Sequence, residues 1–96
     1  MTLDDFKNSL SATAEPSGLT PPLRALWWAG RGEWDRAHQM TNAIDTPTGA
    51  WIHAHLHRQE GDLANARYWY GRAAKPEFDG SIEAEWAAIV SALLAE

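Results

Sequence analysis

The chain has 96 residues, of which 45% are hydrophobic, and it carries a net charge of −5. This composition is typical of one globular domain, and the acidic balance argues against binding to nucleic acid or to an anionic membrane surface, because both need a dense basic patch. The chain contains no cysteine, which excludes disulfides, thiolate metal sites, iron–sulfur clusters and a cysteine nucleophile.

The N-terminal segment predicts a helix followed by a linker. Thr2 can cap a helix over about 2–13, with Asp4 and Asp5 in the first turn, where the helix dipole favours negative charge. The segment lacks a basic region followed by an apolar one, so it does not resemble a signal peptide. No run in the chain approaches the roughly 20 apolar residues that cross a bilayer. We therefore expect a cytoplasmic protein.

Four further helices are predicted in the middle of the chain, each bounded by proline, glycine or a capping residue. They cover about 21–31, 33–44, 47–60 and 62–74. Two of them carry an apolar face at helical spacing, formed by Trp34, Ala37, Met40, Thr41 and Ile44 in one and by Leu63, Ala66, Tyr70, Ala73 and Ala74 in the other. We expect both faces to be buried.

A last helix is predicted over about 82–95, with Ser81 as its cap. Its apolar face comprises Ile82, Trp86, Ile89, Val90, Leu93 and Leu94. We interpret the acidic residues of this segment, Glu83 and Glu85 among them, as solvating an outer helix. No segment alternates apolar and polar residues convincingly, so the sequence predicts an all-α fold with about six helices in antiparallel pairs.

The middle of the chain repeats itself when shifted by 29 residues. The shift aligns Ala25 with Ala54, Gly32 with Gly61, Ala37 with Ala66, and Pro47 with Pro76. Over about 22–76 the chain thus resembles the tetratricopeptide repeat family. The resemblance implies a single domain, 1–96, built from an N-terminal helix and linker (1–20), two repeats (21–47 and 48–76) and a C-terminal capping helix (77–96).

The same resemblance implies a binding groove. In tetratricopeptide repeats the first helix of each unit lines the concave surface, and Trp51, His55, Arg58 and Gln59 match groove-lining positions. An aromatic ring beside an arginine suits a peptide segment or a carboxylate. The alternative is a tryptophan wedged against the neighbouring helix beside a solvated arginine.

The opposite side of the same helix carries a second candidate site. His53, His57 and Glu60 follow at helical spacing, so two imidazoles and a carboxylate could share one metal ion, to which His38 could contribute from the preceding helix. We favour the other interpretation, in which these histidines are buried and hydrogen-bond to tyrosine hydroxyls or carboxylates, and we assign no metal ligand.

The predicted function is a non-enzymatic interaction module that uses the groove to bind a protein or peptide, with an acidic segment as one candidate partner. We expect no cofactor and assign no catalytic residue, because the sequence has neither a phosphate-binding loop nor a nucleophile turn. One or two of the six tryptophans could be exposed and anchor a homodimer. The alternative is a small metal- or anion-binding protein, with a potential enzymatic role, centred on His53 and His57.

Overall fold

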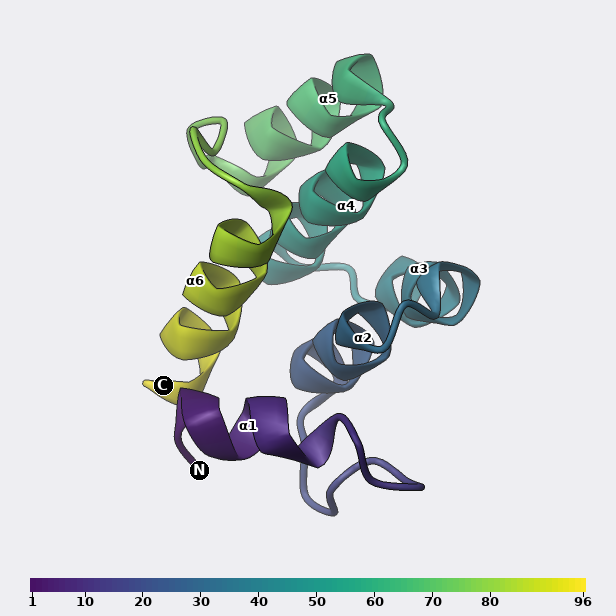
Figure 1. The fold of residues 1–96 in the computed structure, drawn as a ribbon. Helices are drawn as coiled ribbons and strands as arrows, with labels where there is room; N and C mark the ends of the chain where they lie inside the picture. Colours follow the sequence, from purple (N-terminus) through teal and green to yellow (C-terminus); the bar gives the residue numbers. More distant parts are fainter.

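The computed structural model describes residues 1–96 and contains six α-helices and no strand (Figure 1). The all-α prediction is therefore confirmed. The helices are α1 (Leu3–Ser9), α2 (Pro21–Gly30), α3 (Trp34–Asn42), α4 (Pro47–Gln59), α5 (Leu63–Ala73) and α6 (Ile82–Leu94). None of them combines the length and the apolar character that crossing a bilayer requires.

Two helical hairpins, α2 with α3 and α4 with α5, form the middle of the molecule (Figure 1). Their connections have the same geometry. Gly32 and Gly61 adopt φ values of +79° and +82°, in the left-handed region that glycine enters without steric cost. The residue after each glycine donates its backbone N–H to a carbonyl of the preceding helix, Glu33 to Trp28 at 3.0 Å and Asp62 to His57 at 2.9 Å. The repeated spacing of glycine in the sequence thus corresponds to a repeated turn.

Small residues bring the helices of each hairpin close together. Ala25, Ala37 and Ala54 are completely buried, and Ala66 is 3% exposed. The alanines that the repeat aligns therefore lie where the helices pack against one another. A larger side chain at any of these positions would have no space to occupy.

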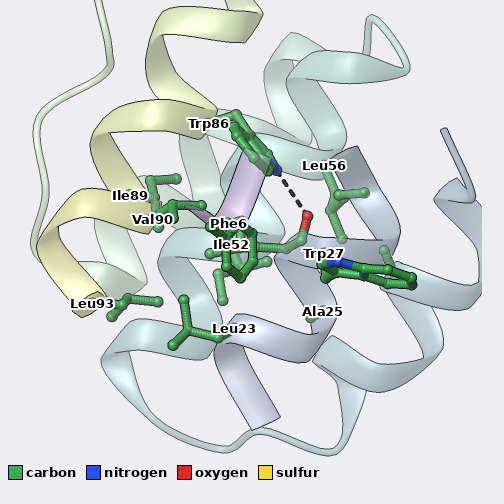
Figure 2. Close-up of a cluster of buried hydrophobic side chains, with 13 residues drawn as sticks. Phe6, Leu23, Ala25, Trp27, Ile52, Leu56, Trp86, Ile89, Val90 and Leu93 are labelled. Atoms are coloured by element: carbon green, nitrogen blue, oxygen red, sulfur yellow. Dashed lines mark hydrogen bonds between the residues drawn. The ribbon is translucent and has the colours of Figure 1, made fainter. Parts of the chain in front are cut away.

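The C-terminal helix α6 lies across both hairpins, where it contacts α2 and α4 (Figure 1). Its apolar face forms the main core together with residues of α1, α2 and α4 (Figure 2). The indole Nε1 of Trp86 donates a hydrogen bond of 2.8 Å to the backbone carbonyl of Leu26, which ties α6 to α2 (Figure 2). α6 therefore covers the face that the first helices of the two hairpins present.

The first helix is shorter than predicted. It ends at Ser9 rather than near residue 13. The guanidinium of Arg31 donates to the carbonyl of Leu10 at 3.0 Å and to that of Ala12 at 2.5 Å, and so binds carbonyls that a longer helix would use internally. Trp27 also donates to the hydroxyl of Ser9, at 3.0 Å. These contacts come from α2 and its end, which the local sequence does not reveal.

The predicted apolar face of α5 is only partly correct. Ala66, Tyr70 and Ala73 are buried, but Leu63 is 57% exposed. Leu63 is the first residue of the helix and lies at an end that no other helix covers. Ala74 is exposed as well and ends the helix in the left-handed conformation, with φ of 56°. The left-handed backbone conformation of Ala74 directs its side chain away from the contact between α4 and α5.

Candidate functional site

Helix α4 is the central helix of the fold, because it contacts α2, α3, α5 and α6. Ile52 and Leu56 enter the main core. The polar residues divide between two sides: His53 and His57 lie near aromatic rings of α3 and α5, whereas His55 and Arg58 bind α6. The two polar faces predicted from helical spacing are thus confirmed, and each has its own set of partners.

A fully buried carboxylate, Glu85 of α6, organises the first of these sides. One of its oxygens lies 2.8 Å from His55 Nδ1 and accepts a hydrogen bond of 2.9 Å from Arg58. The other oxygen accepts a hydrogen bond from the hydroxyl of Tyr70 on α5. Arg58 also donates to the carbonyl of Gly80, at 2.6 Å. The network joins α4, α5, α6 and the loop before α6.

The electrostatics of this network keep the carboxylate charged. Burial alone would raise the pKa of Glu85, but the hydrogen bonds from His55, Tyr70 and Arg58 outweigh burial and hold the pKa below its ordinary value. Burial and the neighbouring Glu85 raise the pKa of Tyr70, which therefore stays protonated and donates. An ionised Glu85 also requires the proton of His55 to reside on Nδ1.

The predicted groove residues are thus largely covered by the chain itself. His55 is completely buried, and the side chain of Arg58 is only 16% exposed. Trp51 is half-buried beneath Lys75, whose Nζ lies 4.4 Å from the ring centroid. Gln59 is half-buried and lines a small cavity with residues of α6. The expectation that Arg58 is free to meet a partner is wrong, because its carboxylate partner is Glu85 of the same chain. Ligand binding at the four residues stays a prediction.

Sequence reasoning missed the role of Glu85. The prediction placed it among solvating acids, yet its exposure is 0%. A signal was present, because Glu85 precedes Ile89 by four residues and thus lies on the apolar face of α6. A charged residue within an apolar stripe indicates a buried partner.

On the other side of α4, three imidazoles meet. His38 of α3, together with His53 and His57 of α4, can each offer a nitrogen such that these atoms all lie within 4.8 Å of one another. The centroids of the rings of His38 and His53 are 5.3 Å apart, and those of His38 and His57 are 5.5 Å apart. We call these three residues the histidine cluster. His53 and His57 are buried, as predicted, with exposures of 4% and 6%.

Two tryptophans hold the rings of the histidine cluster in place. Trp34 stacks on His38 with a centroid distance of 4.7 Å and an interplanar angle of 10°. Trp69 stacks on His53 with corresponding values of 4.1 Å and 13°. Trp34 is itself fixed, since its indole Nε1 donates to the carbonyl of Leu56 at 2.7 Å. The cluster therefore has walls on two sides that restrict ring rotation.

The histidine cluster favours neutral imidazoles. Burial, together with the proximity of His38 and His57, lowers the pKa of His53 to about 4. Burial and the proximity of His57 also lower the pKa of His38. Neutral imidazoles keep a free lone pair near pH 7, which is the form that coordinates a metal ion.

The hydrogen bonds of the cluster differ from one ring to the next. His57 Nδ1 lies 2.6 Å from Glu60 Oε1, which leaves its Nε2 free. His53 Nδ1 is buried and has no hydrogen-bond partner. The prediction of histidines bonded to carboxylates or tyrosines therefore describes His57 and not His53. A buried polar atom without a partner is uncommon in folded proteins.

The residues that converge differ from the predicted set of metal ligands. Of His53, His57 and Glu60, only the two histidines join the cluster with His38, and Glu60 instead orients His57 from its Nδ1 side. Glu60 and the exposed Asp62 form a second, acidic group with His57. Sequence reasoning missed the contribution of Trp69, because its contact with His53 depends on how α5 packs against α4.

A cavity of about 500 Å³ adjoins the cluster. It lies between the α3–α4 connection, the N-terminus of α4 and one side of α5. His53, Trp69 and Arg72 line it together with Asn42, Ile44, Asp45, Thr46, Pro47 and Ala50. One of the three cluster histidines is thus reachable from a polar cavity.

Comparison of the chain with protein-family models, with curated proteins and with solved structures finds no match.

Proposed function

We propose that the protein binds one divalent transition-metal ion of the zinc class through His38, His53 and His57. The observation that supports this proposal is the convergence of three imidazoles whose coordinating nitrogens lie within 4.8 Å of one another. Coordination through Nδ1 of His53 would also give that buried atom the partner it lacks. Three histidines with an open fourth position are a familiar ligand set for zinc.

The chemistry of the donors selects the class of metal. Neutral imidazoles suit zinc, copper, nickel and cobalt, whereas calcium and magnesium prefer oxygen ligands. Glu60 acts from outside the cluster, because a carboxylate bound to one imidazole nitrogen directs the other nitrogen at the metal and increases its basicity. The low pKa values of His38 and His53 mean that few protons must be displaced at pH 7.

Metal binding requires a small contraction of the cluster. A zinc–nitrogen bond of about 2.0–2.1 Å in tetrahedral geometry separates two ligating nitrogens by about 3.4 Å. The nitrogens, now within 4.8 Å of one another, would approach by up to about 1.4 Å. His38 can supply this movement, because it lies on α3, is half-buried and makes no hydrogen bond that would break.

The interaction module predicted from the sequence receives less support from the geometry. The face predicted to bind a partner is covered by α6, and the arginine predicted to bind an acidic segment binds Glu85. A partner at this face would have to displace a helix whose residues Trp86, Ile89, Val90 and Leu93 belong to the main core. The cluster needs no such rearrangement.

The test is a calorimetric titration of the metal-stripped protein with Zn²⁺. We expect binding of one ion per chain and a higher melting temperature, because a ligand that prefers the folded state stabilises it by mass action. His38→Gln should weaken binding more than tenfold, since a lost ligand costs more than the roughly 10- to 100-fold loss from a supporting residue. Its fold should persist, because His38 is half-buried.

Asp62→Asn is the matched control. It removes a charge from the acidic group around His57 but keeps the cap of α5, where the Asp62 side chain accepts from the backbone of Asn65. Zinc affinity should then change by less than about twofold. Equal weakening by both variants, or no stoichiometric binding to the folded wild type, would overturn the proposal.

A further inference from the structure

The cavity beside the histidine cluster has the features of a ligand site. It is formed by residues from three segments, and His53, one of the proposed metal ligands, is in its wall. His53 is 4% exposed, and its buried Nδ1 has no hydrogen-bond partner. The cavity is therefore a polar space beside a proposed metal ligand.

Two sources of positive potential face this cavity. Arg72 lines it, and the only hydrogen bond from its guanidinium in this structure goes to the hydroxyl of Tyr68, at 2.9 Å. Four of the five N–H donors of the guanidinium are thus available. The N-terminus of α4, a helix of 13 residues, opens at the same cavity with Thr46 and Pro47 in its wall. The helix dipole gives this end a partial positive charge, although Pro47 has no N–H and the N–H of Gly49 donates to the Thr46 side chain.

Trp69 links the arginine to the metal site. Its ring stacks on His53, and the guanidinium carbon of Arg72 lies 5.4 Å from its centroid. The guanidinium and the His53 imidazole therefore contact the same indole. Both groups also line the cavity.

The cavity also carries one negative side chain. Asp45 is exposed and also lines the cavity, where it opposes the charge of Arg72. The planar fork of a guanidinium matches the two oxygens of a carboxylate.

We infer that this cavity binds a small monocarboxylate, which Arg72 holds and which occupies the open coordination position of the metal on the histidine cluster. The inference rests on the proposed metal-binding function and extends it to a second component. It gives the protein the character of a receptor for a metal–carboxylate pair rather than for a metal ion alone. The ring of Trp69 would form the apolar wall beside the carbon chain.

The test uses the protein loaded with Co²⁺, whose visible absorption reports the ligands around the ion, and acetate as the probe. We expect acetate to change the visible bands in a saturable manner. Arg72→Gln should weaken the acetate response about tenfold, since a hydrogen bond to a charged group is lost, while the Co²⁺ titration stays unchanged. Arg67→Gln is the matched control, because Arg67 lies on the same helix but pairs with Glu77 at an exposed site and is absent from the cavity wall.

The outcomes separate the two proposals. If folded protein binds no Co²⁺, the proposed metal function fails and the carboxylate site fails with it. If Co²⁺ binds but acetate leaves the bands unchanged, only the carboxylate site is overturned. If Arg72→Gln and Arg67→Gln weaken the acetate response equally, or if neither does, the role assigned to Arg72 is overturned. Phosphate binding as well as acetate at equal concentration would overturn the preference for a carboxylate.

Discussion

His55 on α4 and Glu85 on α6 form a hydrogen-bonded pair in which both side chains have 0% exposure, with 2.8 Å between Nδ1 and the carboxylate oxygen. The partners are 30 residues apart in the chain. A charged group at such a site is tolerated only with several donors, which His55, Arg58 and Tyr70 supply. The pair therefore fixes the position of α6 over the hairpins.

The Glu85 network should be a major determinant of stability. Glu85→Gln removes the charge and leaves Arg58 without compensation at a largely buried site, so we expect a loss of roughly 2–4 kcal/mol in the free energy of unfolding. Urea denaturation followed by circular dichroism measures it. Glu83→Gln, an exposed acid on the same helix turn, should change stability by less than about 0.5 kcal/mol. Similar effects of both substitutions would show that Glu85 is not the buried anchor of α6.

The contact between α4 and α5 depends on a small residue at position 66. Ala66 is 3% exposed and packs with Ala54 and Tyr70. Ala66→Leu should overpack this contact and lower the free energy of unfolding by roughly 1–3 kcal/mol. Ala64→Leu, at an exposed position of the same helix, should be nearly neutral in the same measurement. A neutral Ala66→Leu would contradict the close packing of the hairpin.

Two glycines of the second hairpin should respond to alanine in opposite ways. Gly61 has φ of +82°, so Gly61→Ala strains the backbone and should cost about 1 kcal/mol, although no atom lies within 4 Å of the added methyl group. Gly71 lies inside α5, also with open space around it. Gly71→Ala should stabilise the protein by about 0.5–1 kcal/mol, because alanine has the higher helix propensity. Thermal unfolding measures both, and shifts of the same sign would refute the assigned turn.

Acid should destabilise the metal-stripped protein through His53. In the folded state its pKa is about 4, against an ordinary value of 6.5, so between these values the unfolded chain binds more protons. The free energy of unfolding then decreases as the pH falls from about 6.5 towards 4, by up to about 3 kcal/mol. The charged and titratable groups around His53 are His38 on α3, His57 on α4, Asp45 before α4 and Arg72 on α5.

The variant His53→Gln isolates this contribution. Carboxylates and the other histidines also titrate, so the relevant quantity is the difference between the wild type and the variant at each pH. That difference should change between pH 6.5 and 4 and stay constant above pH 7. Parallel stability profiles would mean that His53 has the same pKa in both states and is not desolvated.

The sequence by itself determined the helices and most of their ends. Proline at the start of α2 and α4, Ser81 before α6 and glycine at positions 32 and 61 act through groups within about four residues along the chain. Such local signals can be recognised in the sequence without knowledge of the tertiary structure. Helical spacing likewise placed His53 and His57 on one side of α4 and His55 and Arg58 on the other, because that geometry belongs to a single helix.

Only the tertiary structure decided which groups these two sides meet. The proximity of His38 to His53 and His57, the stacking of Trp69 on His53 and the burial of Glu85 against His55 all depend on how separate helices pack. Likewise Arg31, at the end of α2, binds carbonyls of the residues that follow α1. Packing angles and positions follow from many side chains acting together, so no single pattern along the chain encodes them. Helical spacing placed His55 and Arg58 on one side of α4, but their partner Glu85 comes from α6.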